Sequence, residues 1–131
     1  MQAEPKLSSN VAASLSDYDA IRETIQRYIS GGKTGNTAEM KLAFHKDATI
    51  FGYIGPNLIA GPIQSLFDWN DQNGAAAELE GRVTSIDLVG SVATARIELD
   101  NWSGHRFTDF FTLLKFDGEW KVMNKVFYLH P

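Results

Sequence analysis

The first part of the chain has the pattern of an amphipathic helix. From Ser16 to Gly32, apolar residues recur every three or four positions and would form one buried stripe. These residues are Tyr18, Ile21, Ile25, Tyr28 and Ile29. Ser16 can cap the helix start, and Gly31 and Gly32 predict its end. Residues 1–15 show little periodicity, so we expect a flexible N-terminal arm followed by a single domain over residues 16–131.

Two shorter helices and a strand are expected next. A second helix is predicted from Thr37 to about Phe44, capped by Asn36 or Thr37. Ala48–Ile54 is rich in β-branched and aromatic residues, which is typical of a strand. Gly61 and Pro62 open a third helix that closes at Asn73 and Gly74, with a strand fragment at Leu58–Ala60 before it.

The second half of the chain has the alternating pattern of an antiparallel sheet. Strands are expected over 83–89, 93–100, 107–116 and 120–129. Asp117-Gly118 is a strong signal for a two-residue hairpin between the last two. The order of helices and one strand followed by a long antiparallel meander indicates an α+β domain.

The register of the last hairpin divides its residues between two faces. With Phe116 opposite Glu119, one face carries Phe107, Asp109, Phe111, Leu113, Trp120, Val122, Asn124, Val126 and Tyr128. The other carries Phe110, Thr112, Leu114, Lys121, Met123, Lys125 and Phe127. The face with Val122 is expected to be the interior, because the other has two lysines. Both faces are substantially apolar, which predicts that a second copy of the chain covers the outer face as a homodimer.

This register places one carboxylate among apolar neighbours. Asp109 would lie between Phe107 and Phe111, and Asn124 would lie diagonal to it. A buried carboxyl group must be hydrogen-bonded, neutralised or facing a wet cavity. We therefore expect either a functional pocket with Asp109 and Asn124 as polar groups, or a carboxylate satisfied by backbone groups or exposed at a sheet edge.

Composition narrows the class of protein. The chain has 131 residues, 44% of them hydrophobic and 21% charged, as in a globular domain. Its net charge of −4 argues against nucleic-acid binding. No apolar run reaches membrane-spanning length, and the first residues lack a secretory pattern, so no membrane association and a cytoplasmic location are expected. The absence of cysteine excludes thiolate chemistry, and three scattered histidines predict no metal site.

The order of elements resembles a known superfamily. Phe44-His45-Lys46-Asp47-Ala48, the Gly61-Pro62-Ile63 helix start, the 107–115 strand and the Asp117-Gly118-Glu119-Trp120 hairpin are similar to nuclear transport factor 2-like domains. Within them, the similarity is closest to the branch named for lumazine binding, itself similar to the SnoaL-like polyketide cyclases. The resemblance spans about residues 17–129.

The resemblance implies a fold and a range of functions. It implies a cone-shaped, mixed and mostly antiparallel sheet wrapped around the N-terminal helices, with an apolar pocket at the open end and dimerisation through the outer face. Members include isomerases, dehydratases and cyclases as well as binding modules. In the ketosteroid isomerase of this fold class, an Asp base works with a Tyr and a protonated Asp. Asp109 on a late strand and Tyr28 on the first helix are in positions that fit such an acid and phenol. The strand over 48–54, however, has no carboxylate to act as the base.

Further candidates are aromatic residues and one histidine. His45 is either an acid or base in the pocket or a cap on the preceding helix. Planar ligands could stack on aromatic walls, although each such residue could equally be core. The aromatic candidates are Phe51, Tyr53, Trp69, Trp102 and Phe111.

Two functions follow as hypotheses. The first is a small-molecule-binding domain with an apolar pocket for an apolar or aromatic ligand. The second is a cofactor-free isomerase, dehydratase or cyclase in which Asp109 acts as acid or base with help from Tyr28 or His45. No cofactor is expected for either. A dimerising interaction module is the third possibility.

Overall fold

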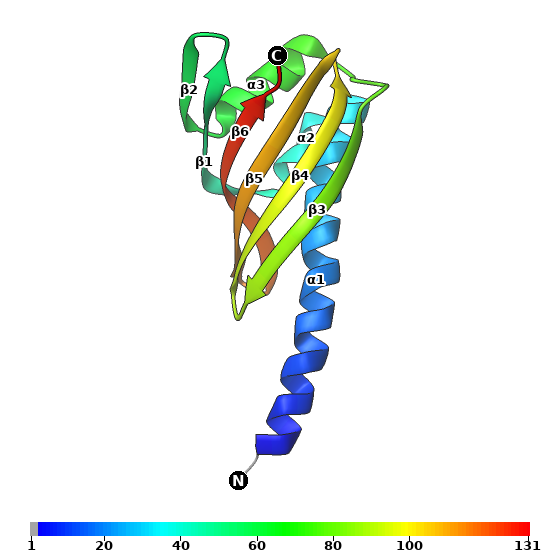
Figure 1. Cartoon of the computed structure of the whole chain (residues 1–131), viewed down its shortest axis with the longest axis vertical. Coiled ribbons are helices and arrows are strands. Elements are labelled where there is room, and N and C mark those ends of the chain that lie inside the picture. Colours follow the sequence, from blue (N-terminus) through cyan, green and yellow to red (C-terminus); the bar gives the residue numbers. More distant parts are fainter. Residues whose placement is uncertain (1–2) are drawn as a thin grey trace.

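The fold consists of three helices and one curved sheet of six strands (Figure 1). The computed structural model describes the backbone of residues 3–131 and the side chains of residues 15–131. The elements are α1 (Ala3–Thr34), α2 (Thr37–Lys41), β1 (Phe44–Ile54), β2 (Asn57–Pro62), α3 (Gln64–Asn73), β3 (Glu80–Val89), β4 (Val92–Trp102), β5 (His105–Phe116) and β6 (Glu119–Leu129). The predicted helix start at Ser16 is wrong, because α1 already begins at Ala3. The flexibility of residues 1–15 stays a prediction.

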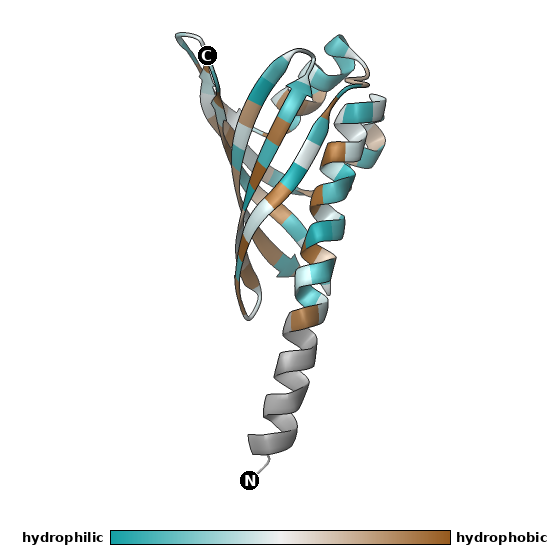
Figure 2. Cartoon of the chain, turned by 45° about the vertical axis from the view of Figure 1, so that its right-hand side comes forward, coloured by the Kyte–Doolittle hydropathy of each residue, from teal (hydrophilic) through white to brown (hydrophobic). Residues whose placement is uncertain are grey.

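The sheet is mixed and mostly antiparallel. Its strand order is β2-β1-β6-β5-β4-β3, and β1 and β6 form the one parallel pair among the five neighbouring pairs of described strands. The sheet curves, and α1 lies against its concave side (Figure 2). The predicted α+β class, with a curved sheet wrapped around helices, is confirmed. None of the described helices is both long enough and apolar enough to cross a membrane.

The end of α1 differs from the prediction. Gly31 and Gly32 are inside the helix, which continues to Thr34 and is followed by Gly35 at a φ of +77°. A Cβ on Gly32 would lie 2.6 Å from the Trp102 ring, and one on Gly31 would lie 2.6 Å from Met40 Cβ. The glycine pair therefore permits close packing rather than ending the helix.

The boundaries of the next elements also shift. α2 ends at Lys41 rather than near Phe44, and β1 begins at Phe44 rather than at Ala48. The Asn36 cap is confirmed, because its side chain accepts a hydrogen bond from the Glu39 amide at 3.1 Å. Pro62 ends β2 instead of opening the third helix, whose N-cap is Ile63.

The last hairpin carries the largest correction. Asp117 and Gly118 have φ values of 51° and 78°, and Phe116 pairs with Glu119 as predicted. Further along, however, Leu113 pairs with Val122 whereas Thr112 pairs with Asn124. Met123 is therefore the extra residue of a β-bulge, and it reverses which side chains of β6 point inward.

The bulge reverses the expected orientation of the remaining residues of β6. The predicted interior position of Val126 is wrong, since its side chain is 45% exposed. The predicted outward position of Lys125 is also wrong, since this residue is 5% exposed, and Phe127 is buried on the same face. One inserted residue thus brings a lysine into the core, on the same face as Asp109.

Candidate functional site

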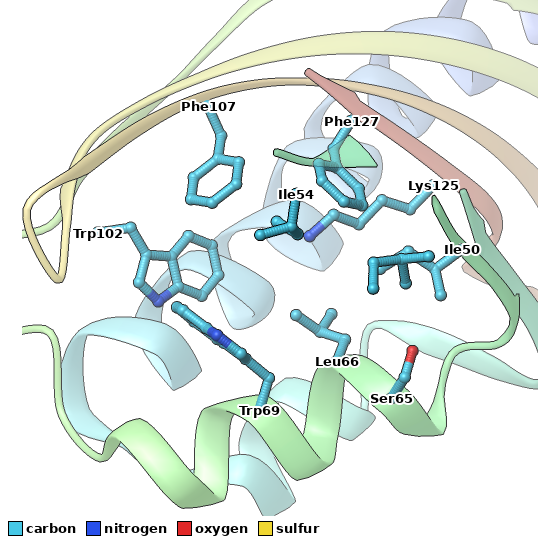
Figure 3. A pocket seen from close by; sticks show the side chains of 10 residues that line it. Ile50, Ile54, Ser65, Leu66, Trp69, Trp102, Phe107, Lys125 and Phe127 are labelled. Atoms are coloured by element: carbon cyan, nitrogen blue, oxygen red, sulfur yellow. The ribbon is translucent and has the colours of Figure 1, made fainter. Parts of the chain in front are cut away.

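A largely apolar cavity lies where β1, β2 and α3 meet the ends of β4, β5 and β6 (Figure 3). Its volume is about 110 Å³. Its ten lining residues are Ile50, Ile54, Ile59, Ser65, Leu66, Trp69, Trp102, Phe107, Lys125 and Phe127. Ile54 is 40% exposed, so the cavity reaches the surface beside the end of β1.

Tight backbone packing fixes the aromatic walls. Gly52 on β1 lies under Phe127, and a Cβ at this position would come within 2.5 Å of that ring. The Trp69 and Trp102 rings meet edge to face with centroids 5.8 Å apart, and Phe107 packs against Trp102 at 6.3 Å. The walls are rigid aromatic surfaces that suit an apolar ligand.

A buried polar triad lies at one wall of the cavity and joins three elements. Tyr28 on α1 donates a hydrogen bond from Oη to Asp109 Oδ2 on β5 at 2.5 Å. Lys125 on β6 donates from Nζ to Tyr28 Oη at 2.8 Å, and its Nζ lies 3.8 Å from Asp109 Oδ2. The triad therefore places an amine, a phenol and a carboxyl group within hydrogen-bonding or ion-pair distance of one another.

Only the amine of this triad lines the cavity. Asp109 and Tyr28 are both 0% exposed and lie behind Lys125. Among the described residues, Asp109 Oδ1 has no hydrogen-bond partner. In Figure 3 the nitrogen end of Lys125 extends between Ile54 and Phe127 toward the space above Leu66. The expectation that Asp109 itself faces a pocket is therefore corrected, since the carboxyl group reaches the cavity only through Lys125.

Burial changes the acid–base properties of all three groups. Desolvation lowers the pKa of Lys125, and the Asp109 carboxylate opposes this shift only in part. Desolvation also raises the pKa of Asp109 against the opposing effects of Lys125 and the Tyr28 hydrogen bond. Burial, with Asp109 as a neighbour, raises the pKa of Tyr28 well above its usual value. A larger fraction of Lys125 is therefore unprotonated near neutral pH than of an exposed lysine.

Two of the predicted polar site residues lie apart from the cavity. His45 lies within β1, where its Nδ1 accepts a hydrogen bond from the Asp47 amide at 3.0 Å, so it does not cap α2. Asn124 is not a partner of Asp109, because the bulge turns it to the other face and its side chain donates to Thr49 Oγ1 at 2.7 Å.

The aromatic candidates divide into three groups. Trp69 and Trp102 line the cavity. Phe51 and Tyr53 are 39% and 61% exposed on the outer face of the sheet. Phe111 is buried beneath the cavity, with its ring centroid 5.2 Å from that of Tyr28.

The sequence interpretation missed Lys125. The interpretation placed it outward because regular alternation was continued past Val122. The one hint of a bulge in the sequence is that Met123 and Phe127, both apolar, then fall on the face assigned to solvent. In the part of the chain that the structure describes, no three His, Asp or Glu side chains gather as a metal-binding group.

Comparison with known proteins places these features in a family. A family model described as "Putative lumazine-binding" matches residues 16–128. The chain is 30% identical over 117 residues to a protein named Aldolase FrzH from Cladobotryum sp., covering 88% of this chain and 94% of that relative.

Two crystal structures of nuclear transport factor 2-like proteins of unknown function are also similar. The protein from Methylobacillus flagellatus is 50% identical with a TM-score of 0.86, covering 88% of this chain and 94% of that one. The protein from Shewanella baltica is 44% identical with a TM-score of 0.85, covering 89% and 96%. With the curved sheet and the residue 16–128 match, these similarities show that the chain belongs to the lumazine-binding family of the nuclear transport factor 2-like superfamily.

Proposed function

We propose that this domain binds a small, mostly apolar carbonyl compound in its cavity, with Lys125 as the partner of the carbonyl oxygen. The observation that supports this most is the combination of apolar walls with one buried amine. Apolar pockets with few polar groups bind ligands by area and orient them by those polar groups. The lining also includes the Ser65 hydroxyl group and the indole N–H groups of Trp69 and Trp102.

The size of the cavity favours a compact ligand. A dry cavity of about 150 Å³ holds one benzene molecule. The present cavity of about 110 Å³ is smaller, so a ligand of one small ring fills it. A larger ligand would extend past Ile54 to the surface.

A matched pair of ligands tests this proposal. Cyclopentanone and methylenecyclopentane have nearly the same shape, but only the first carries an oxygen. We expect both to shift the methyl NMR signals of Ile50 and Leu66. Cyclopentanone should bind up to roughly tenfold more tightly, because a hydrogen bond from an uncharged amine contributes about 0.5–1.5 kcal/mol.

Variants test whether the amine of Lys125 causes the preference for cyclopentanone over methylenecyclopentane. In Lys125→Met the preference for cyclopentanone should disappear while methylenecyclopentane binds as before, and exposed Lys46→Met should behave as the wild type. If Lys125→Met does not fold, the comparison is made between Asp109→Asn and the double variant that adds Lys125→Met. No binding of either ligand, or an equal preference without Lys125, would contradict the proposal.

The second candidate function is reversible aldol cleavage and condensation without a cofactor. A relative that is 30% identical across most of both chains is named an aldolase, and this favours carbonyl chemistry over binding alone. The geometry gives less support to direct proton abstraction by Asp109, because Lys125 and Tyr28 separate its carboxyl group from the cavity.

A minimal substrate tests catalysis. Diacetone alcohol is a compact β-hydroxy ketone whose cleavage gives two molecules of acetone, which proton NMR detects directly. We expect the wild type and the control variant Lys46→Met to cleave it faster than buffer does, and we expect Lys125→Met to lose that cleavage. Equal rates with protein and with buffer would overturn the aldol proposal but would leave ligand binding in place.

We also propose that the domain forms a homodimer through an outer patch on the convex face of the sheet. The outer patch consists of Phe51, Tyr53, Leu58, Phe110, Val126 and Tyr128. Phe51, Val126 and Phe110 lie side by side across β1, β6 and β5. Exposed apolar areas of this kind are typical of interaction surfaces.

A further inference from the structure

Lys125 is an unusual residue for the wall of an apolar cavity. Its side chain is 6% exposed, and its Nζ lies 4.8 Å from the Tyr28 ring and 5.6 Å from each of the Trp102 and Phe127 rings. Burial of an amine and a carboxyl group such as those of Lys125 and Asp109 costs desolvation energy, and apolar residues of similar volume would fill the same space without that cost. A structural role alone therefore explains the position of Lys125 poorly.

The contacts of the amine leave it available to a ligand. Within the described residues, the one hydrogen bond from Lys125 Nζ goes to Tyr28 Oη. The distance of 3.8 Å to Asp109 Oδ2 is too long for a direct hydrogen bond. Lys125 lines the cavity, and Figure 3 shows its nitrogen end beside Ile54 and Phe127. A carbonyl carbon in the cavity can approach this nitrogen without displacing a protein partner.

We propose that Lys125 forms a covalent imine with the carbonyl carbon of a small aldehyde or ketone bound in the cavity. This inference rests on the proposed carbonyl-binding function and adds a bond that binding alone does not require. It assigns a nucleophile to the site, whereas the chemistry expected from the sequence uses Asp109 as acid or base with help from Tyr28 or His45.

The chemistry balances without an oxidant or reductant. The Nζ lone pair forms a bond to the carbonyl carbon, the π electrons move to oxygen, and a proton passes from nitrogen to oxygen to give a carbinolamine. The hydroxyl group then leaves with a proton as water, and a carbon–nitrogen double bond forms. Addition of water later reverses both steps and releases the amine.

The protonated imine of a β-hydroxy carbonyl compound would then support cleavage of the bond between its α and β carbons. The electron pair of this bond forms the enamine double bond as the positive nitrogen is neutralised, the β-hydroxyl proton passes to water at the open end of the cavity, and a second carbonyl compound is released. The enamine that remains takes up a proton at carbon, and hydrolysis frees the first product. Formation of the bond follows the same steps in reverse.

The neighbours of the amine have positioning roles in this scheme. Tyr28 Oη accepts the hydrogen bond from Nζ at 2.8 Å and so holds the nitrogen at the wall of the cavity. Asp109 accepts the Tyr28 hydrogen bond at 2.5 Å and would balance the positive charge of the imine nitrogen. The lowered pKa of Lys125, caused by burial, supplies free amine for the attack near neutral pH.

The test uses pentane-2,4-dione as the probe. An amine and this diketone lose one water and form a stable enaminone that absorbs in the near ultraviolet, apart from the aromatic side chains. At neutral pH we expect one modification per chain, with a mass increase equal to the diketone less one water, mapped to Lys125 by peptide mass spectrometry. Modification of Lys125 should exceed that of exposed Lys46, because burial lowers the pKa of Lys125 and leaves more free amine at neutral pH.

Variants separate this inference from the proposed function. Lys125→Arg keeps a cation but cannot form an imine, so the near-ultraviolet band should vanish, whereas Lys46→Arg should keep it. Modification that is equal at Lys125 and Lys46, or that persists in Lys125→Arg, would overturn the inference. If cyclopentanone still binds in that case, carbonyl binding stands without the covalent step; if it does not bind, both fail.

Discussion

At the scale of single residues, the site depends on how one buried carboxyl group affects one buried amine. Asp109 raises the pKa of Lys125 by charge attraction, against the larger effect of desolvation. Removal of that negative charge should therefore lower the pKa of Lys125 further, with the Tyr28 contact still in place. The charge of Asp109 then sets the pH range in which the amine is a nucleophile.

The variant Asp109→Asn tests this effect. We expect the pH profile of the reaction of Lys125 with pentane-2,4-dione to move to lower pH, because less charge attraction holds the proton on nitrogen. Asp68→Asn is the matched control, since Asp68 is exposed on α3 and accepts a hydrogen bond from Gln64 at 2.9 Å. An unchanged profile in Asp109→Asn, or equal shifts in both variants, would contradict the assigned role of Asp109.

The sequence predicted part of this triad. The inward position of Asp109 follows from the alternation of β5, and its need for a partner follows from the cost of burying a carboxyl group. Tyr28 falls on the buried stripe of α1 by helical spacing. The contact between them joins residues 81 positions apart, so it depends on how α1 crosses the sheet rather than on any local pattern.

At the scale of elements, α1 is attached to the last hairpin by a polar contact. Asp17 Oδ1 accepts hydrogen bonds from Trp120 Nε1 and from Lys115 Nζ, both at 3.0 Å. The Trp120 hydrogen bond, with further help from Lys115, lowers the pKa of Asp17 in spite of partial desolvation. The contact holds α1 at Asp17 against β5 and β6.

The stability of this contact should depend on pH. Since the folded pKa of Asp17 is below its unfolded value, its contribution is present above the unfolded pKa and is lost as pH falls through the folded pKa. We expect Asp17→Asn to reduce the free energy of unfolding by about 1–2 kcal/mol at neutral pH, measured by urea denaturation. The difference from the wild type should shrink in acid.

A matched variant on the same helix controls for the loss of a charge. Asp19 has an 82% exposed side chain and a weak ion pair with Arg22 at 3.8 Å. Asp19→Asn should change the free energy of unfolding by less than about 0.5 kcal/mol. A loss in Asp17→Asn that is independent of pH, or no larger than that in Asp19→Asn, would contradict the contact.

Elements were easier to predict than their exact ends and faces. The Asp117-Gly118 turn has residues that adopt positive φ, so its register could be counted from the sequence as far as Val122. The bulge at Met123 could not be predicted, because it depends on how β6 pairs with β1 on one side and with β5 on the other. The same irregularity appears on β1, whose register with β6 shifts between Phe44 and Thr49.

At the scale of the whole molecule, the outer patch predicts the oligomeric state. Size-exclusion chromatography with light scattering should give the mass of a dimer for the wild type. Phe110→Lys should give a monomer, because it places a charge within the patch, where Phe110 is 54% exposed. Val89→Lys should remain dimeric, since Val89 is 77% exposed at the far hairpin of β3 and β4.

A monomeric wild type at micromolar concentration would contradict the dimer, as would a dimer that persists in Phe110→Lys. The cavity chemistry is separable from this outcome, because Lys125 and Phe110 lie on opposite faces of the sheet. The expected cytoplasmic location stays a prediction.

The fold as a whole was predictable because its signals agree. Helical spacing, strand alternation and turn residues each indicated the same α+β domain, and the residues quoted for the family resemblance lie within the part of the chain that the family model matches. The cavity was less predictable, since its walls come from β1, β2, α3 and the ends of three further strands. Trp69 on α3 and Trp102 at the end of β4 are far apart in the sequence and meet there through the tertiary fold.

The most direct test of the central claim is an NMR titration of the Lys125 side chain in protein labelled at lysine. We expect the Lys125 signal to titrate at lower pH than an unperturbed lysine and to shift when cyclopentanone is added. A Lys125 signal that titrates like an unperturbed lysine and does not respond to the ketone would show that the cavity amine is not the functional group proposed here.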